Sequence, residues 1–344
     1  MIYKSCHLIE HGISIDVNSI KACCLSREFD KGQLMILPYY GNNTINWDEL
    51  FRIKKRQRLL QQEKTLSACE GCYNLREENW DDADYISFIN FDHWNQCNSD
   101  CIYCGVQKNK PKTQNNILKP IKELIKSGKF KNNGEITFQG GEPTVLKEFE
   151  ELLKIFVKQG SKIRIHSSGI LFSRAIRNGL KQGVVTVVIS PDSADRETYK
   201  KIKRTDKSNK VWENIKHYRK NLKDKISANV KVKYIIIPGI NDSYEQITEF
   251  LQKIKEYDIK SIIVDIEYTY ANRNIKNISP HIYIIMDYIE NFAKTNNIEY
   301  ELYDSALYAD KNRTYDKTCN FDEQNIKSQI SSYIETNKSK NIQY

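Results

Sequence analysis

Three cysteines on one short segment carry the clearest chemical signal in the sequence. Cys97, Cys101 and Cys104 stand four and three residues apart in the segment CNSDCIYC. Thiolates at this spacing can hold three corners of a cubane iron–sulfur cluster, and no fourth cysteine is close in sequence. One iron would then stay open to a small molecule, just as a catalytic zinc ion keeps an open position. A structural zinc site is the alternative, although zinc normally takes four ligands.

A second group of cysteines lies before residue 75. Cys69 and Cys72 form a C-x2-C pair, and Cys6 and the doublet Cys23-Cys24 stand upstream. Such a pair by itself fits zinc, a redox pair or an iron–sulfur cluster. Because side chains of neighbouring residues diverge, we expect only one cysteine of the doublet to be a ligand. Four protein ligands are then available for one metal centre.

The composition narrows the class of protein. The 344 residues are 40% hydrophobic, which excludes a disordered chain. The net charge of +9 is spread along the chain and forms no basic arm for nucleic acid. The apolar runs are too short to span a bilayer, and the amino terminus has no signal-peptide pattern. We therefore expect a cytoplasmic protein with no membrane partner, in which clustered cysteines bind metal instead of forming disulfides.

One further cysteine, Cys319, stands alone near the carboxyl terminus. A buried thiol is the simplest interpretation, because an isolated cysteine packs as a small apolar side chain. A hydrogen-atom donor or a distant cluster ligand is the alternative.

The elements that must position these cysteines alternate between strand and helix from residue 85 onward. Amphipathic spacing predicts helices over 146–157, 211–222 and 244–254. Short runs rich in Ile and Val predict six strands, at 85–91, 135–138, 162–166, 184–190, 230–237 and 261–268. This alternation predicts an α/β fold, a partial (β/α)6 TIM-type barrel, with ligands at the carboxyl ends of the strands. We divide the chain into a small cysteine-rich N-terminal module (1–80), the barrel (81–275) and a C-terminal helical extension with a polar tail (276–344).

Over about residues 85–270 the sequence resembles the radical S-adenosylmethionine (radical SAM) superfamily. Its signature is the same C-x3-C-x2-C loop after the first strand, with an aromatic residue before the last cysteine, here Tyr103. The resemblance implies that the loop holds a [4Fe–4S] cluster and that S-adenosylmethionine binds the open iron. It also implies that an electron from flavodoxin or ferredoxin cleaves S-adenosylmethionine. The resulting 5′-deoxyadenosyl radical abstracts hydrogen from a substrate.

A glycine motif of the superfamily follows the second predicted strand. It consists of Gln139, Gly140, Gly141 and Glu142. The two glycines allow a backbone to approach a ligand closely, and Glu142 offers an acceptor for an ammonium group. The resemblance implies that this segment holds the methionine amino group.

Later strand ends supply the other predicted contacts to S-adenosylmethionine. The resemblance implies that Ser190, with Asp192 in reserve, binds the ribose hydroxyls. Arg204 is predicted to bind the methionine carboxylate, with a solvated surface arginine as the alternative. Ile237 is predicted to face the adenine, with ordinary barrel core as the alternative. The segment Ser167–Gly169 stands where the family often has Thr-Asn-Gly, so its role stays open.

The N-terminal cysteines resemble the twitch or SPASM-type modules of radical SAM enzymes, although here the module precedes the barrel. The resemblance implies an auxiliary [4Fe–4S] cluster, with zinc or unmetallated cysteines as alternatives. Because such modules are typical of enzymes that crosslink, oxidise or epimerise peptides, a peptide or protein substrate is the main prediction. A small metabolite or sugar nucleotide is the alternative substrate, and a non-catalytic metal-binding module is a more remote one. A nucleic-acid substrate is not expected.

Overall fold

The computed structural model describes residues 2–22, 37–38, 44–65, 69, 72, 74–81, 84–105, 116–267, 278–302 and 323–337. The predicted ligands Cys23 and Cys24 and the lone Cys319 lie outside these residues. The chain forms two compact units. The first unit joins Met1–Cys97 to Val106–His166, and the second joins Asn98–Gly105 to Ser167–Tyr344. The domain boundaries predicted at residues 80 and 275 differ from this division and stay predictions.

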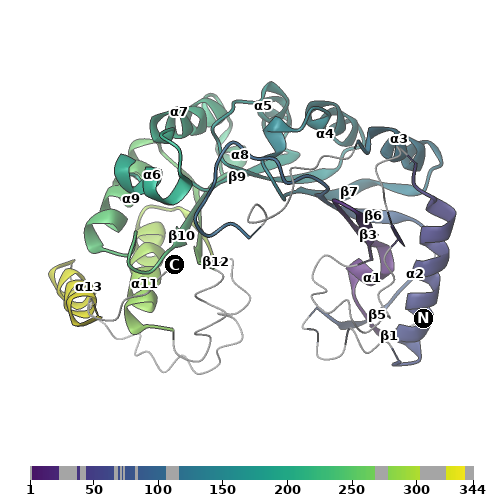
Figure 1. Cartoon of the computed structure of the whole chain (residues 1–344), viewed down its shortest axis with the longest axis horizontal. Coiled ribbons are helices and arrows are strands. Elements are labelled where there is room, and N and C mark those ends of the chain that lie inside the picture. Colours follow the sequence, from purple (N-terminus) through teal and green to yellow (C-terminus); the bar gives the residue numbers. More distant parts are fainter. Residues whose placement is uncertain are drawn as a thin grey trace. The chain divides into compact units, whose positions relative to one another are not determined.

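The first unit contains a sheet in which four neighbouring strands are parallel and two more continue it antiparallel. In sheet order these strands are β8 (Lys162–Ser167), β7 (Phe130–Phe138), β6 (Ile86–Asp92), β2 (Gly12–Asp16), β3 (Ser19–Lys21) and β4 (Leu37–Pro38). Figure 1 labels β7, β6 and β3 of this sheet. The strand β2 pairs directly with β6. Its side chains Ile13 and Ile15 are buried. The removal of their apolar surface from water stabilises this strand in the sheet. The N-terminal segment therefore extends the same sheet as the first barrel strand.

Helices and a small hairpin complete the first unit. Helix α4 buries Phe149, Leu152, Leu153 and Phe156 along one face, as its apolar spacing predicts. The Phe156 ring lies 5.6 Å from the ring of Phe91 on β6, centroid to centroid. The elements are α1 (His7–His11), α2 (Trp47–Gln62), α3 (Leu118–Lys126), the 3-10 turn η3 (Pro143–Val145), α4 (Phe149–Lys158) and the antiparallel pair β1 (Ile2–Ser5) and β5 (Arg76–Asn79).

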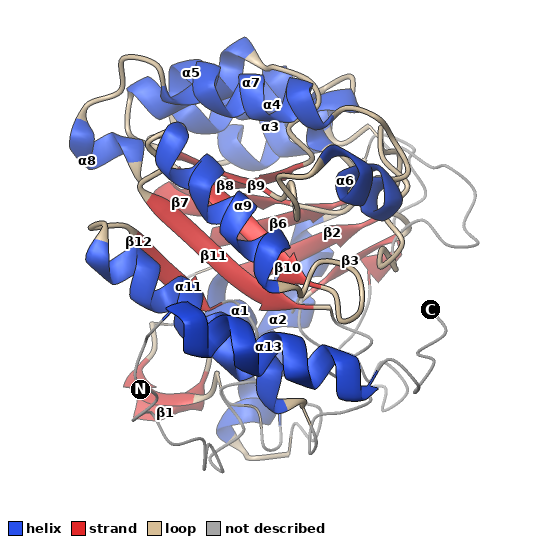
Figure 2. Cartoon of the chain, turned by 90° about the vertical axis from the view of Figure 1, so that its left-hand side faces the viewer, coloured by secondary structure: helices blue, strands red, loops and turns tan. Residues whose placement is uncertain are grey.

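The second unit is built on parallel strands in the order β9, β10, β11 and β12. Helix α5 packs on β9, α7 on β10 and α11 on β12. Figure 2 shows α11 beside β12. The strands are β9 (Val185–Ile189), β10 (Val230–Ile236), β11 (Ser261–Ile266) and β12 (Glu299–Leu302). The helices are α5 (Arg174–Lys181), α6 (Arg196–Lys203), α7 (Ser208–Arg219), α8 (Asp224–Ser227), α9 (Tyr244–Glu256), α11 (Pro280–Thr295) and α13 (Glu323–Asn337).

The predicted α/β fold is confirmed. All six predicted strands are present, as β6 to β11, and the mostly parallel pairing is that of a partial TIM-type barrel. The strand β12 was not predicted, because the short segment Glu-Tyr-Glu-Leu has no apolar run and becomes a strand by pairing with β11. No helix in the described part of the chain is long and apolar enough to cross a membrane.

Candidate active site

In the first unit, the predicted glycine motif lies against the segment that leads from β6 into Cys97. The Gly141 backbone N–H donates to the Trp94 carbonyl oxygen at 3.1 Å. The Glu142 backbone N–H donates to the Gln96 carbonyl oxygen at 2.8 Å. Two segments that are about 45 residues apart in the sequence are therefore held side by side, because the ends of the parallel neighbours β6 and β7 meet at one edge of the sheet.

Both glycines of this motif are required by the backbone packing. Gly140 has φ +96°, and a Cβ there would lie 2.3 Å from Oδ1 of Asp92. A Cβ on Gly141 would lie 2.1 Å from the carbonyl oxygen of Gln96. Any side chain at these positions would push the two segments apart.

We therefore expect Gly141→Ala to destabilise the protein by about 1–3 kcal/mol, the usual cost of overpacking, and to lower the iron content. Chemical denaturation and iron analysis of the reconstituted protein measure both effects. Gly105→Ala is the matched control, because a Cβ on Gly105 meets no atom of the described residues within 4 Å. Equal behaviour of the two variants would contradict the packing argument.

The carboxylate of Glu142 serves a local role in the structure. The side chain is 1% exposed, and its Oε1 accepts hydrogen bonds from the Thr144 backbone N–H and hydroxyl. It thereby begins the 3-10 turn η3. Its contact with a ligand ammonium stays a prediction.

In the second unit, the loop that carries Cys101 and Cys104 is held on the end of helix α6. The Asp100 N–H donates to the Lys203 carbonyl oxygen at 3.1 Å, and the Ile102 N–H donates to the Ile202 carbonyl oxygen at 3.0 Å. Within the loop, the Cys104 N–H donates to the Cys101 carbonyl oxygen at 3.0 Å. The two cysteines therefore sit on a tight turn whose position depends on α6.

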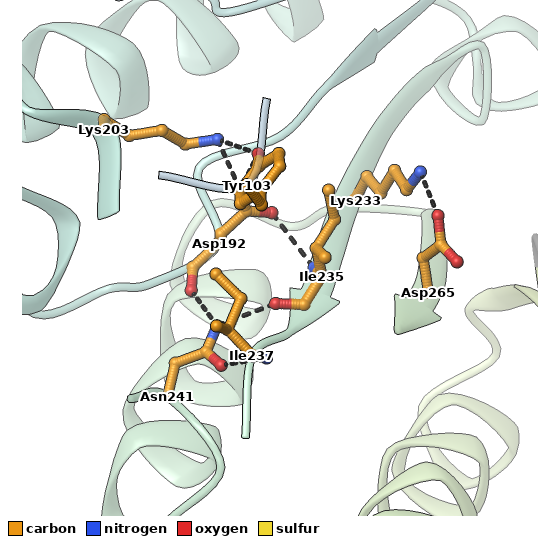
Figure 3. A network of polar contacts seen from close by, with 8 residues as sticks. All are labelled: Tyr103, Asp192, Lys203, Lys233, Ile235, Ile237, Asn241 and Asp265. Atoms are coloured by element: carbon orange, nitrogen blue, oxygen red, sulfur yellow. Dashed lines mark hydrogen bonds and ion pairs between the residues drawn. The ribbon is translucent and has the colours of Figure 1, made fainter. Parts of the chain in front are cut away.

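A buried polar network lies under this loop (Figure 3). The Tyr103 hydroxyl donates to Oδ2 of Asp192 at 2.6 Å, and the same oxygen pairs with the Lys203 ammonium. Lys203 also donates to the Tyr103 hydroxyl at 2.6 Å. The second carboxylate oxygen of Asp192 accepts the backbone N–H of Ile235 at 3.0 Å. The network thus ties the cysteine loop to the ends of β9 and β10.

Asp192 and Ser190, the two residues predicted to bind ribose, differ in burial and in hydrogen bonding. Asp192 is completely buried, and both of its carboxylate oxygens accept hydrogen bonds from the protein. Ser190 is half-buried, directly after β9. The role of Asp192 is therefore to brace the loop, and Ser190 stays the predicted ribose contact.

The neighbouring residues Lys203 and Arg204 lie in different environments. Arg204 ends helix α6 with φ +52°, and its side chain is 56% exposed and pairs with Asp100 at 2.9 Å. This is the surface position that was the alternative for Arg204, so its contact with a carboxylate stays a prediction. Lys203 was missed by the sequence analysis. It is buried on the same face of α6 as Tyr199 and Ile202, and their i, i+3, i+4 spacing was the signal that could have found it.

The electrostatics of the loop follow from burial. Burial raises the pKa of the Cys101 thiol, and the nearby Lys203 ammonium opposes that rise. Burial also raises the pKa of Tyr103 well above its ordinary value, so the phenol stays protonated and donates to Asp192.

A second residue missed by the sequence analysis, Asn241, connects this network to the end of β10. Its amide Nδ2 donates to the carbonyl oxygens of Asp192 at 2.7 Å and Ile235 at 2.8 Å. Its Oδ1 accepts the Ile237 backbone N–H at 2.7 Å. Ile237 itself is completely buried, in keeping with the alternative that it is barrel core.

Comparison with known protein families gives a match over part of the chain. Residues 91–251 match the family described as the radical SAM superfamily. This segment, 161 of the 344 residues, is similar to the radical SAM superfamily. The cofactors that the sequence predicts, a [4Fe–4S] cluster and S-adenosylmethionine, are those of this superfamily.

Several proteins are similar to this chain. A GTP 3′,8-cyclase of Clostridium botulinum (strain Okra / Type B1) is 29% identical over 189 residues, which are 53% of this chain and 56% of the relative. Molybdenum cofactor biosynthesis protein 1 of Dictyostelium discoideum is 29% identical over 199 residues, 53% of this chain and 30% of the relative. The chain thus spans about half the length, or less, of these curated relatives.

Among solved structures, Streptococcus suis SuiB bound to its precursor peptide SuiA aligns with a TM-score of 0.53 and 12% identity, covering 94% of this chain and 78% of SuiB. SuiB bound to S-adenosylmethionine aligns with a TM-score of 0.52 and 14% identity, covering 81% of this chain and 60% of SuiB. At this identity the similarity shows a common fold.

The three thiols on the cysteine loop fit a cubane cluster better than a single metal ion. Cys97, Cys101 and Cys104 are half-buried and form no disulfide. In the described residues, no three His, Cys, Asp or Glu side chains converge on one metal ion. A cubane does not require such convergence, because each cysteine binds a different iron. Three thiols with no fourth ligand among the described residues therefore fit the cluster and fit a mononuclear zinc site poorly.

The N-terminal cysteines lie partly together in the first unit. Cys6 and Cys69 are buried in one apolar cluster with Ile9, although 63 residues of sequence separate them. The half-buried Cys72 follows on a turn, where its N–H donates to the Cys69 carbonyl oxygen at 3.1 Å. Tertiary packing therefore brings the first cysteine of the chain to the C-x2-C pair.

Proposed function

We propose that this protein is a radical SAM enzyme that abstracts hydrogen from a small metabolite, and specifically from a nucleotide. The observation that carries this proposal is the 29% identity to GTP 3′,8-cyclases over 189 residues. The net charge of +9 also favours a phosphorylated, anionic substrate. A peptide substrate, the main prediction from the sequence, has weaker support, because the similarity to SuiB at 12% identity concerns the fold alone.

The cofactor site follows from the same proposal. We propose that Cys97, Cys101 and Cys104 hold the [4Fe–4S] cluster and that S-adenosylmethionine binds beside it. When bound, these groups supply a 5′-deoxyadenosyl radical. Gly140 and Gly141 let the glycine motif lie close against the segment that leads into Cys97. The chain's own task is to place these groups and to keep water away from the radical.

Other side chains of the site position the cysteine loop. Lys203 and Asp192 hold Tyr103 from below the loop, and Asn241 braces Asp192 from β10. In the proposed site, Ser190 contacts the ribose. Electron delivery by flavodoxin or ferredoxin stays part of the proposal.

The substrate is tested with the anaerobically reconstituted, dithionite-reduced enzyme and S-adenosylmethionine. Nucleoside triphosphates, sugar nucleotides and a peptide mixture are supplied in separate reactions, and 5′-deoxyadenosine is measured by mass spectrometry. We expect 5′-deoxyadenosine formation to rise at least about tenfold with a nucleotide, because productive binding orients the reacting groups. A deuterated nucleotide should pass deuterium to 5′-deoxyadenosine. If only the peptide mixture raised 5′-deoxyadenosine formation, this result would overturn the nucleotide proposal and support the predicted peptide substrate.

We further propose an auxiliary [4Fe–4S] cluster in the N-terminal module 1–80. Its ligands would be Cys6, Cys69, Cys72 and one cysteine of the doublet Cys23-Cys24. The support is the shared burial of Cys6 and Cys69 and the turn that carries Cys72.

Iron analysis tests this second cluster. The reconstituted enzyme should contain about eight iron atoms per chain, and Cys69→Ala should retain about four. S-adenosylmethionine should still be cleaved slowly by that variant, because the cluster at Cys97–Cys104 is unaffected. A wild-type content of about four irons, unchanged by Cys69→Ala, would exclude the auxiliary cluster. One zinc ion in its place would support the zinc alternative.

A further inference from the structure

The cysteine loop contains two buried hydrogen-bond donors that the cofactor contacts described above do not use. Asn98 and Ser99 stand between Cys97 and Cys101. The amide Nδ2 of Asn98 is buried and has no hydrogen-bond partner among the described residues. The Ser99 side chain is 7% exposed, and its hydroxyl likewise lacks a partner in the described part of the chain. A buried donor without an acceptor costs about 1–3 kcal/mol, so two of them in one loop require an explanation.

The orientation of the Asn98 amide is set from the end of β8. The Ser168 hydroxyl donates to Oδ1 of Asn98 at 2.9 Å. The same hydroxyl oxygen accepts the Ile170 backbone N–H at 3.3 Å, so its own proton is available for Asn98. With Oδ1 held in this way, the NH2 group is the part of the amide that remains for another partner. This also gives a role to Ser168, whose position departs from the family pattern.

The missing partner must be an acceptor, because Nδ2 can only donate. A cubane held by this loop brings such acceptors with it, namely cysteine thiolates and inorganic sulfides. Hydrogen bonds to these sulfurs stabilise the more negative, reduced cluster and thereby raise its reduction potential.

We propose that Asn98, oriented by Ser168, donates a hydrogen bond to a sulfur of the cluster at Cys97–Cys104 and so sets the reduction potential of that cluster. Ser99 lies one residue away and serves as a second, weaker donor. Asn98 and Ser168 are thus positioning and tuning residues, and neither is a ligand. This inference rests on the proposed three-cysteine cluster, which iron analysis tests separately.

The experiment is a redox titration of the reconstituted enzyme without S-adenosylmethionine, followed by electron paramagnetic resonance of the reduced cluster. The signal is assigned by its absence in Cys101→Ala. Asn98→Ala should shift the midpoint potential to a more negative value. Asn98→Asp keeps the acceptor for Ser168 but replaces the donor by a carboxylate, so its shift should be larger and in the same direction. Ser168→Ala should shift the potential as Asn98→Ala does, whereas Ser168→Thr keeps the hydroxyl and the wild-type value.

Two outcomes would overturn the proposal. Midpoint potentials of Asn98→Ala and Asn98→Asp equal to that of the wild type, at equal iron content, would mean that the donor faces water and not a sulfur. Weaker binding of S-adenosylmethionine with an unchanged potential would assign the donor to that ligand instead. Asn209→Ala, an exposed site on α7, is the control and should leave the potential unchanged. Loss of the cluster in the wild type itself would instead refute the proposed function.

Discussion

Replacing Cys101 by alanine should abolish reductive cleavage of S-adenosylmethionine and remove about four iron atoms per chain. With one of three thiolates gone, a cubane keeps only two protein ligands, and the loop cannot supply another because no other cysteine is near in sequence. Cys97→Ala and Cys104→Ala should behave in the same way. The measurements are iron and sulfide content after anaerobic reconstitution, and 5′-deoxyadenosine formed with dithionite.

Cys72→Ala is the matched control for this prediction. It removes a half-buried thiol from the other group of cysteines, so 5′-deoxyadenosine formation should persist even if iron is lost. Cleavage activity that survives in Cys101→Ala and disappears in Cys72→Ala would reverse the proposed roles of the two groups. Activity retained in every cysteine variant would refute the cluster site altogether.

Replacing Lys203 by methionine should destabilise the protein by about 3–5 kcal/mol, the cost of leaving a buried charge without its partner. Asp192 is completely buried and its side chain pairs with the Lys203 ammonium. Its remaining partners, the Tyr103 hydroxyl and the Ile235 N–H, are neutral donors. The variant therefore holds an uncompensated carboxylate under the cysteine loop. Urea denaturation of the apoprotein measures the free energy of unfolding.

Arg204→Met tests whether burial, and not charge alone, produces this effect. Arg204 follows Lys203 in sequence and pairs with Asp100 at 2.9 Å, but both side chains are more than half exposed. Such surface pairs contribute about 0–1 kcal/mol, so Arg204→Met should change the free energy of unfolding much less than Lys203→Met. Similar losses in both variants would show that the network under the loop does not stabilise the fold. A larger loss of stability in Arg204→Met than in Lys203→Met would instead support the predicted role of Arg204 in the site.

Much of the fold could be predicted from local patterns. The strands β6 to β11 match predicted strands, because runs of Ile and Val between turn residues form strands wherever both faces are covered. The pairing of β2 with β6 could not be predicted. Strand partners are chosen by long-range contacts, and nothing in Gly12–Asp16 specifies its neighbour. For the same reason the polar segment Glu299–Leu302 was missed, since β11 supplies its hydrogen-bond partners.

The chemistry proposed for this protein rests on the sequence itself. Thiolate donors at Cys97, Cys101 and Cys104 owe their cluster-binding potential to side-chain type and to spacing along one loop, which are local properties. Only the tertiary structure decided which of the adjacent residues Lys203 and Arg204 is buried, and that Asp192 is a brace and not a free carboxylate. The burial of these side chains and their hydrogen-bond partners depend on how α6 packs and on where the strands end. Those contacts join residues that are far apart in the chain.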